Sequence, residues 1–372
     1  MNKNKKKEVI LFLGSGATAG SGMVKNGKSL PTDQNFFAEQ NGVYGIIKDW
    51  QKKYPALKLC RDEIPEIKLP SLYQTWNHLF IFRGLARANL CDDKNLIQKF
   101  EELKNHTWPD DYKWRAEHYE HQFEAIRLGW SKLYYLAELA IWDLRVLIKD
   151  LYSDLKNSNG AFKTLKEKLN EDLNRSIVVN LNYDTTFDDY IENGFSPLQE
   201  RELFCEKLDK KIIRPHGSLK WTSKCGFSLT KKDWIPPWDE TFEDTHLRDQ
   251  GYQRTSNTEE LIFHQSLIVP STYFKEEIIG NSTMPGLASQ LLWNQWRHME
   301  MALEQAEEII FYGTSLASGD DHLCFLIRNN VKSKKIRVID RKKDENEKKD
   351  CFEKKWKKRF KMVEFDYIDL KY

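Results

Sequence analysis

The chain has few cysteines, and none of them are arranged as metal ligands usually are. No two form a CxxC pair, so a four-cysteine zinc ribbon is absent. Disulfide frameworks are typical of short secreted chains and are not expected in a chain of 372 residues. We therefore predict neither a metal site nor structural disulfides. The six cysteines are Cys60, Cys91, Cys205, Cys225, Cys324 and Cys351.

Long apolar runs are also missing. No stretch approaches the ~20 apolar residues that span a bilayer. The basic stretch Lys3–Lys7 and the apolar run Val9–Leu13 imitate a signal peptide. That run is shorter than the roughly seven to fifteen residues of a signal-peptide core, and Glu8 adjoins it. We expect a cytoplasmic protein without membrane association.

Neither sign of charge is in clear excess. The 58 basic and 56 acidic residues leave a net charge of +2, which argues against attraction of the whole chain to nucleic acid. Lysines are concentrated in residues 342–361, but the acids among them favour a solvated helix face. We therefore expect no direct binding of nucleic acid.

Short apolar runs predict buried strands of a parallel sheet. The clearest are Val9–Leu13 and Ile177–Val179, and the others are residues 211–213, 267–270, 308–312, 336–340 and an edge strand in 360–367. Residues 33–170 have mainly helical patterns, with one or two long amphipathic helices in 111–155. Residues 218–260 are rich in tryptophan and proline and are expected to be irregular.

These patterns predict an α/β protein with a Rossmann-like open, mainly parallel sheet and a large helical insert. We place the sheet domain in residues 1–40 and 171–372, and the insert in residues 41–170. The aromatic helices of the insert are where we expect contacts between subunits.

A run of small residues, Gly14–Gly22, follows the first predicted strand. Such a run lets the backbone approach a phosphate, and amide hydrogens supply the charge complement. Gly14 and Gly16 form a G-x-G, with Ala19 in place of the third glycine of the dinucleotide fingerprint. The alternative is a flexible loop that binds no ligand.

Gly22–Ser29 matches the pattern of a nucleotide-binding P-loop, G-x-x-x-x-G-K-S. The preceding strand ends eight residues before this segment, and Pro31 follows where the helix should begin its second turn. A P-loop NTPase that depends on Lys28 remains an alternative, but we expect Lys28 to lie in a solvated loop.

Two further predicted strands end in polar residues. The strand around Val178 leads into Asn180, Asn182, Tyr183 and Asp184, after which Thr185 and Thr186 offer N-caps for a helix. The strand at 211–213 leads into Arg214-Pro215-His216-Gly217. An open α/β sheet binds ligands at the carboxyl ends of its strands. The alternative is a plain strand–turn–helix junction, because Asn and Asp are common turn residues.

Four strand-end motifs together resemble the sirtuin family, in particular the zinc-free sirtuin-like NADases of bacterial antiphage defence. Gly14–Thr18 with Ser21-Gly22 resembles the family's GAG(I/A)S…SG loop, and Asn182-Tyr183-Asp184 resembles its NxD motif. His216-Gly217 resembles the catalytic HG, and residues 313–316 match GTSL letter for letter. The resemblance covers roughly residues 8–35 and 175–340.

The sequence also departs from the family pattern. Protein-deacylating sirtuins carry four zinc-binding cysteines after HG, and this chain has nothing comparable. Leu181 stands where glutamine usually precedes NxD, and Pro31-Thr32-Asp33 is only a stretched version of PDFR. These departures count against acyl-lysine chemistry more than against NAD+ binding.

The resemblance implies that the chain hydrolyses NAD+ to nicotinamide and ADP-ribose through an oxocarbenium-like state. His216 would act as a base, Asn182 would hydrogen-bond the ribose or the attacking water, and Asp184 would hold nearby backbone or the ribose. NAD+ is thus a substrate, and no metal is expected. The residues that the resemblance assigns to NAD+ binding are Gly14, Ser15, Gly16, Ala17, Thr18, Gly313, Thr314, Ser315 and Asp340.

By the same resemblance, such enzymes deplete NAD in infected cells (abortive infection) and stay inactive until triggered. Many form homo-oligomers or act beside a sensor or effector partner, such as a hexameric DNA-translocase ATPase or an Argonaute. Two alternatives share the NAD+ site: an NAD-dependent protein deacylase, and a non-catalytic sensor of NAD or ADP-ribose.

Overall fold

The structure is a computed structural model, and the regions that it describes include the sheet, the helices and the polar strand ends. The described residues are 9–19, 23–113, 115–116, 119–120, 123, 131–153, 155, 176–184, 186–187, 196–197, 211–228, 233–235, 253–254, 260–269, 287–314, 321–330, 335–341, 346–360 and 363–368.

The chain folds into two compact units. The first is assembled from Met1–Val24, Lys156–Ser218 and Leu287–Tyr372, and the second from Lys25–Leu155 and Leu219–Gly286. The sequence placed residues 219–286 with the sheet domain, whereas the structure groups them with the helical part of the chain.

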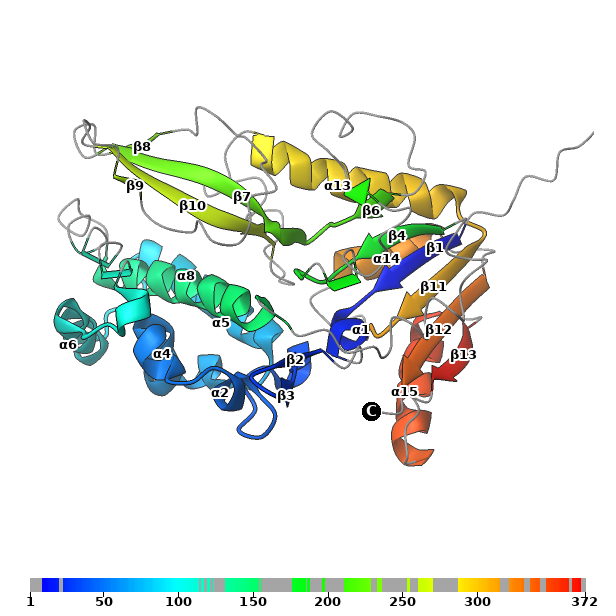
Figure 1. The fold of residues 1–372 in the computed structure, drawn as a ribbon, viewed down its shortest axis with the longest axis horizontal. Coiled ribbons are helices and arrows are strands. Elements are labelled where there is room, and N and C mark those ends of the chain that lie inside the picture. Colours follow the sequence, from blue (N-terminus) through cyan, green and yellow to red (C-terminus); the bar gives the residue numbers. More distant parts are fainter. Residues whose placement is uncertain are drawn as a thin grey trace, which may run out of the picture. The chain divides into compact units, whose positions relative to one another are not determined.

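The first unit is built on one seven-stranded sheet with the order β13-β12-β11-β1-β4-β6-β5 (Figure 1). All six neighbouring pairs run parallel. The predicted α/β fold with an open, Rossmann-like sheet is therefore confirmed. The strands are β1 (Val9–Leu13), β4 (Ser176–Asn180), β5 (Ser196–Pro197), β6 (Lys211–Ile213), β11 (Glu308–Tyr312), β12 (Lys335–Arg341) and β13 (Val363–Ile368).

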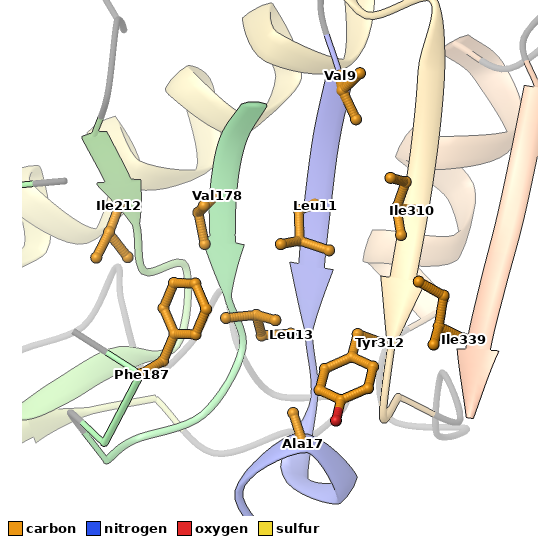
Figure 2. Packing of buried hydrophobic residues seen from close by; sticks show 10 residues of the cluster. All are labelled: Val9, Leu11, Leu13, Ala17, Val178, Phe187, Ile212, Ile310, Tyr312 and Ile339. Atoms are coloured by element: carbon orange, nitrogen blue, oxygen red, sulfur yellow. The ribbon is translucent and has the colours of Figure 1, made fainter. Parts of the chain in front are cut away.

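The central strand β1 is apolar along its whole length because it is covered on both faces. One face carries a cluster that includes Leu11, Leu13 and Ile310 (Figure 2). On the other face Phe12 stacks on Phe311, with ring centroids 5.0 Å apart, and Trp356 lies 4.9 Å from Phe311. Each large side chain buried in this way contributes about 1.5–3 kcal/mol to folding.

The strand order reverses at β1. Starting from β1, the chain first adds β4 on one side of it and later returns to add β11 on the other side. The carboxyl ends of β1 and β11 therefore meet at a topological switch point, where open α/β sheets bind their ligands. The helices described in this unit include α1 (Ser15–Ala19), α13 (Leu287–Gln305), α14 (Asp321–Asn330) and α15 (Asn346–Arg359).

The second unit contains the predicted helices. α8 is the long amphipathic helix expected within residues 111–155. The α-helices of this unit for which the described residues give both ends are α2 (Val43–Ile46), α3 (Trp50–Lys53), α4 (Pro55–Glu63), α5 (Leu72–Arg87), α6 (Lys94–Glu102) and α8 (Lys132–Tyr152). Short 3-10 helices lie at Asp33–Asn35, Pro65–Lys68, Leu103–Asn105 and Asp110–Tyr112.

An ion pair is buried among these helices. Arg115 and Asp143 contact each other with both side chains fully buried. The Asp143 carboxylate also accepts hydrogen bonds from the Tyr119 hydroxyl (2.9 Å) and the Leu57 amide (3.0 Å). The pair is therefore embedded in a hydrogen-bonded network, which is the condition under which a buried ion pair is tolerated.

The prediction that residues 218–260 are irregular is wrong for the part of this range that the structure describes, namely residues 218–228, 233–235, 253–254 and 260. This region contains strands of a four-stranded sheet with the order β8-β7-β10-β9. Its strand β10 ends at Ile268 and therefore includes part of the short strand predicted around residue 267. Within it, the β7–β8 and β9–β10 pairs are antiparallel. Its strands are β7 (Gly217–Ser228), β8 (Asp233–Ile235), β9 (Gln253–Arg254) and β10 (Glu260–Ile268).

The P-loop-like segment forms a β-hairpin. β2 (Val24–Lys25) and β3 (Lys28–Ser29) are joined by Asn26 and Gly27, with φ values of 52° and 73°. Two consecutive residues with positive φ are typical of a type I′ hairpin turn, and Asn-Gly is the favoured pair there. A P-loop requires a strand, a phosphate-binding loop and a helix, so this segment does not have P-loop geometry.

Candidate functional site

The turns that follow β1 and β11 interlock through backbone hydrogen bonds. The Gly16 amide donates to the Gly313 carbonyl at 2.7 Å, and the Gly14 amide donates to the Tyr312 carbonyl at 3.0 Å. The Ala17 amide donates to the Gly14 carbonyl at 2.8 Å. Two motifs about three hundred residues apart in the sequence thus form one backbone unit at the switch point.

Glycine is required where these two turns touch. A Cβ atom on Gly16 would lie 2.6 Å from the Gly313 carbonyl oxygen, and one on Gly313 would lie 2.1 Å from the Ala17 nitrogen. Gly313 also has a φ of 59°, which L-residues rarely adopt. The small residues in both motifs are therefore explained by close backbone approach within the protein.

This interlocking changes the role expected of the glycine-rich loop. The sequence predicted that its amide hydrogens hold a pyrophosphate, but those of Gly14, Gly16 and Ala17 are used by carbonyls of the protein itself. The Ala17 side chain is fully buried in the sheet cluster (Figure 2). Ser15, which begins α1, is half-buried and has no side-chain hydrogen bond to the described residues.

Asn182, Thr18 and Asp184 form a connected polar network. The Asn182 Nδ2 group donates to the Gly14 carbonyl at 2.9 Å and lies 3.0 Å from the Thr18 hydroxyl. That hydroxyl donates to Asp184 Oδ2 at 2.9 Å. The network joins the NxD-like motif to the glycine-rich loop, so these sequence-predicted residues do lie together.

The Asp184 carboxylate acts on the backbone. Its Oδ1 accepts the Thr186 amide at 3.0 Å, which is the hydrogen bond an N-cap makes to the start of a helix. The sequence predicted that the Thr186 side chain caps the helix, but the Thr186 backbone amide instead donates to Asp184, which acts as the cap. Thr185 lies outside the described residues. Both oxygens of Asp184 are thus used in joining Thr18 to Thr186.

His216 lies in a tight turn after β6. The Gly217 amide donates to the Arg214 carbonyl at 2.9 Å, and Gly217 has a φ of 76°. Proline at the second position and glycine at the fourth are favoured in a type I turn, and Pro215 and Gly217 occupy these positions. The local sequence thus determines where the histidine ring leaves the backbone.

The hydrogen bond of His216 defines its tautomer. Nδ1 lies 3.1 Å from the Leu181 carbonyl oxygen. A carbonyl can only accept, so Nδ1 carries the hydrogen and the lone pair of the neutral ring is on Nε2. Leu181 immediately precedes Asn182, so this bond also joins the two motifs. The Trp296 ring lies 6.1 Å from the imidazole.

Arg214 connects this turn to the NxD-like motif. Its guanidinium Nη1 donates to the carbonyls of Asn182 and Asp184 at 3.2 and 3.1 Å. Its backbone amide donates to Gln295 Oε1 on α13 at 2.8 Å. Sequence analysis did not assign a role to Arg214 or Gln295. A signal for Gln295 is its position beside Leu292, Trp296 and Met299 on the buried face of α13.

The remaining predicted residues are only partly placed. Thr314 is 9% exposed. The amide of the preceding residue, Gly313, donates to the Ile339 carbonyl at 3.2 Å. This bond brings Asp340, which follows Ile339, beside the turn. Asp340 is half-buried in β12, which continues through Arg341. Ser315 lies outside the described residues. Asp33 accepts the Tyr73 amide at 2.9 Å, at the start of α5 in the second unit.

The polar cluster is nearly closed to solvent. Asn182 is 8% exposed, and Thr18, Asp184 and His216 are 2–3% exposed.

The solved structures to which this chain is similar include one at a low degree of similarity. No protein-family model and no curated protein matches the chain. A solved structure of a mutant Sir2 homologue in complex with 2′-O-acetyl ADP ribose aligns with a TM-score of 0.33 and 10% sequence identity. The alignment covers 89% of this chain and 79% of that one. The fold class rests on the strand order and parallel pairing described above.

Two features are absent from the described residues. They contain no group of three or more His, Cys, Asp or Glu side chains placed to hold a metal ion. Within the same residues, no helix has the length and apolar character needed to cross a bilayer.

Proposed function

We propose that the protein is an NAD+ hydrolase that cleaves the bond between nicotinamide and ribose. The observation that carries the proposal is the hydrogen bond from His216 Nδ1 to the Leu181 carbonyl. This bond leaves the lone pair of the neutral ring on Nε2 and anchors the ring next to Asn182, at the carboxyl ends of β4 and β6, which supports a role for Nε2 as the base. The order of the four sirtuin-like motifs along the sequence supports the choice of NAD+ as the substrate.

The chemistry requires little of the protein beyond positioning and one base. Nicotinamide leaves with the electrons of the glycosidic bond, and its ring thereby loses its positive charge. Water then bonds to C1′ of the oxocarbenium-like ribose, and its proton passes to His216 Nε2. The products are nicotinamide, ADP-ribose and one proton. A near-neutral pKa is typical of histidine and suits this base role.

The other two catalytic candidates differ in what they can offer. Asn182 uses Nδ2 within the protein, so its Oδ1 is the atom for a ribose hydroxyl or the attacking water. Asp184 has both oxygens in hydrogen bonds to Thr18 and Thr186. In this proposal Asp184 is a positioning residue, in line with the expectation that it holds nearby backbone.

The cellular role follows from the same resemblance. Hydrolysis of NAD+ during phage infection would deplete the cofactor pool and stop growth of the infected cell. We propose that the chain assembles into a homo-oligomer and that a sensor or effector partner, such as a hexameric DNA-translocase ATPase or an Argonaute, controls it.

The test is release of nicotinamide from NAD+ by the purified protein. Wild type is compared with His216→Ala and Asn182→Ala, and with His78→Ala, a helix-surface histidine of the second unit, as the matched control. Circular dichroism establishes that each variant folds. We expect release by wild type and His78→Ala, and loss of at least a hundredfold in the other two.

Each alternative gives a different result. Release that requires an acetylated peptide would indicate a deacylase, and binding of NAD+ without consumption would indicate a sensor. An active His216→Ala variant would contradict the proposed base. If wild type is silent, calorimetry with NAD+ decides the matter, because absence of binding removes the basis for an NAD+ site.

A further inference from the structure

We propose that Asn180 binds the substrate directly, by donating a hydrogen bond from Nδ2 to an oxygen in the ADP-ribose half of NAD+. The proposal rests on the NAD+ hydrolase function proposed above. Asn180 is the last residue of β4 and pairs in register with Leu13, the last residue of β1. It therefore adjoins both the glycine-rich loop and the NxD-like motif.

The orientation of the Asn180 carboxamide follows from its neighbour. Asn180 Oδ1 accepts a hydrogen bond from the Asn182 amide at 3.0 Å. If the carboxamide were flipped, its NH2 group would face the Asn182 N–H, and two donors cannot hydrogen-bond to each other. Nδ2 must therefore be the second atom of the group. Asn180 is 1% exposed, and Nδ2 has no hydrogen-bond partner within the described part of the chain.

An unsatisfied donor at this position is costly. Asn180 is on the same sheet face as Leu13 and Val178, since register partners and alternate residues of parallel strands share a face. That face holds the apolar cluster of the sheet (Figure 2), where an unmatched polar group loses its hydration without compensation. Such groups persist in native proteins where they act on a ligand or hold a water molecule.

Most other donors in the interlocked turns already have acceptors within the protein. The amides of Gly14, Gly16 and Ala17 donate to protein carbonyls, and both hydrogens of Asn182 Nδ2 are directed at protein oxygens. The donors that the sequence offered to the substrate are thus largely used in the fold. Asn180 Nδ2 is a donor in this cluster that the described residues leave without an acceptor.

The acceptor belongs to the ADP-ribose half for a chemical reason. An amide NH2 group binds oxygen acceptors, and the phosphates and riboses of NAD+ supply nearly all of them, whereas nicotinamide supplies one carbonyl. Hydrogen bonds to charged phosphate oxygens are also the stronger ones. The contact forms when the cluster opens to admit substrate.

The test is isothermal titration calorimetry with ADP-ribose and with NAD+, the latter at low temperature and short incubation. Asn180→Ser removes the NH2 donor and keeps a hydroxyl that can accept the Asn182 amide, as in an ST-turn. Asn77→Ser is the control, because Asn77 is a buried asparagine of the second unit whose Nδ2 donates to the Tyr73 carbonyl. We expect Asn180→Ser to weaken both ligands by about tenfold and Asn77→Ser to leave both unchanged.

The outcomes separate this proposal from the function on which it rests. Unchanged affinity in a folded Asn180→Ser variant would overturn the role of Asn180 while hydrolysis by wild type still stands. Weakened NAD+ binding with normal ADP-ribose binding would move the acceptor to nicotinamide and overturn the assignment. If wild type binds neither ligand, both proposals fail together. Should Asn180→Ser not fold, the isosteric Asn180→Asp replaces it, and unchanged affinity there is equally decisive.

Discussion

The amide of Gly16 donates a hydrogen bond to the carbonyl of Gly313 at 2.7 Å. This bond joins the turns that follow the neighbouring strands β1 and β11. The contact leaves no room for a side chain on either residue. The two small-residue motifs therefore form one closely packed pair of turns at the switch point of the sheet.

Gly313→Ala is expected to destabilise the protein by about 3 kcal/mol or more, because its Cβ would meet backbone at 2.1 Å and its φ is positive. Gly27→Ala is the matched control, since Gly27 has a φ of 73° but no atom within 4 Å of the added Cβ. It should cost about 1 kcal/mol. Urea denaturation of both variants measures the difference, and equal effects would show that packing at Gly313 is unimportant.

Arg214→Lys should lower kcat for nicotinamide release by at least tenfold, with a smaller change in KM. A lysine ammonium does not reproduce the planar fork of arginine, so the carbonyls of Asn182 and Asp184 lose their common donor and the base shifts relative to substrate. Arg83→Lys, at a partly exposed contact with Glu138, serves as the control. A kcat equal to wild type would show that Arg214 has no positioning role.

Asp184→Ala is expected to lower the free energy of unfolding by about 2 kcal/mol, because the Thr186 amide and the Thr18 hydroxyl both lose their acceptor. Asp184→Asn keeps an oxygen for Thr186 and should cost less. A double-mutant cycle with Thr18→Val isolates the contact to Thr18. Additive effects in that cycle would mean that the two side chains do not interact.

Lys28→Ala should leave nicotinamide release and stability unchanged. Lys28 is exposed on the β2–β3 hairpin and belongs to no strand–loop–helix unit. Kinetics of the variant beside wild type test this expectation. Loss of turnover in the folded variant would revive the P-loop NTPase alternative.

Asp143→Leu should destabilise the second unit by about 3–5 kcal/mol, because it leaves the buried Arg115 guanidinium without its carboxylate. The double variant Arg115→Met, Asp143→Leu should recover most of that loss, since an apolar pair needs no charge compensation. Asp110→Ala, which removes an exposed partner of Lys113, is the control and should have no measurable effect on thermal unfolding. A double variant no better than Asp143→Leu would contradict this account.

Much of the sheet was predictable from local pattern. Val9–Leu13, Lys211–Ile213 and Glu308–Tyr312 were placed at the bounds that the structure has, because strands buried on both faces are continuous apolar runs. Strands β7, β8, β9 and most of β10 were missed, because β7 and β10 mix polar and apolar residues and lie in a segment rich in tryptophan and proline. Only the end of β10, around residue 267, was predicted as a strand.

For the candidate site, the sequence indicated which polar residues follow the strands but not which hydrogen bonds they make. The sequence by itself determined that Asn182, Asp184 and His216 follow strands and that Gly14–Thr18 and Gly313 form small-residue turns. Only the tertiary structure decided that the loop amides donate to protein carbonyls, that Leu181 orients His216, and that Asn180 keeps an unmatched donor. The reason is that strand propensity depends on neighbours in the chain, whereas a hydrogen-bond partner depends on which distant strands the fold places side by side.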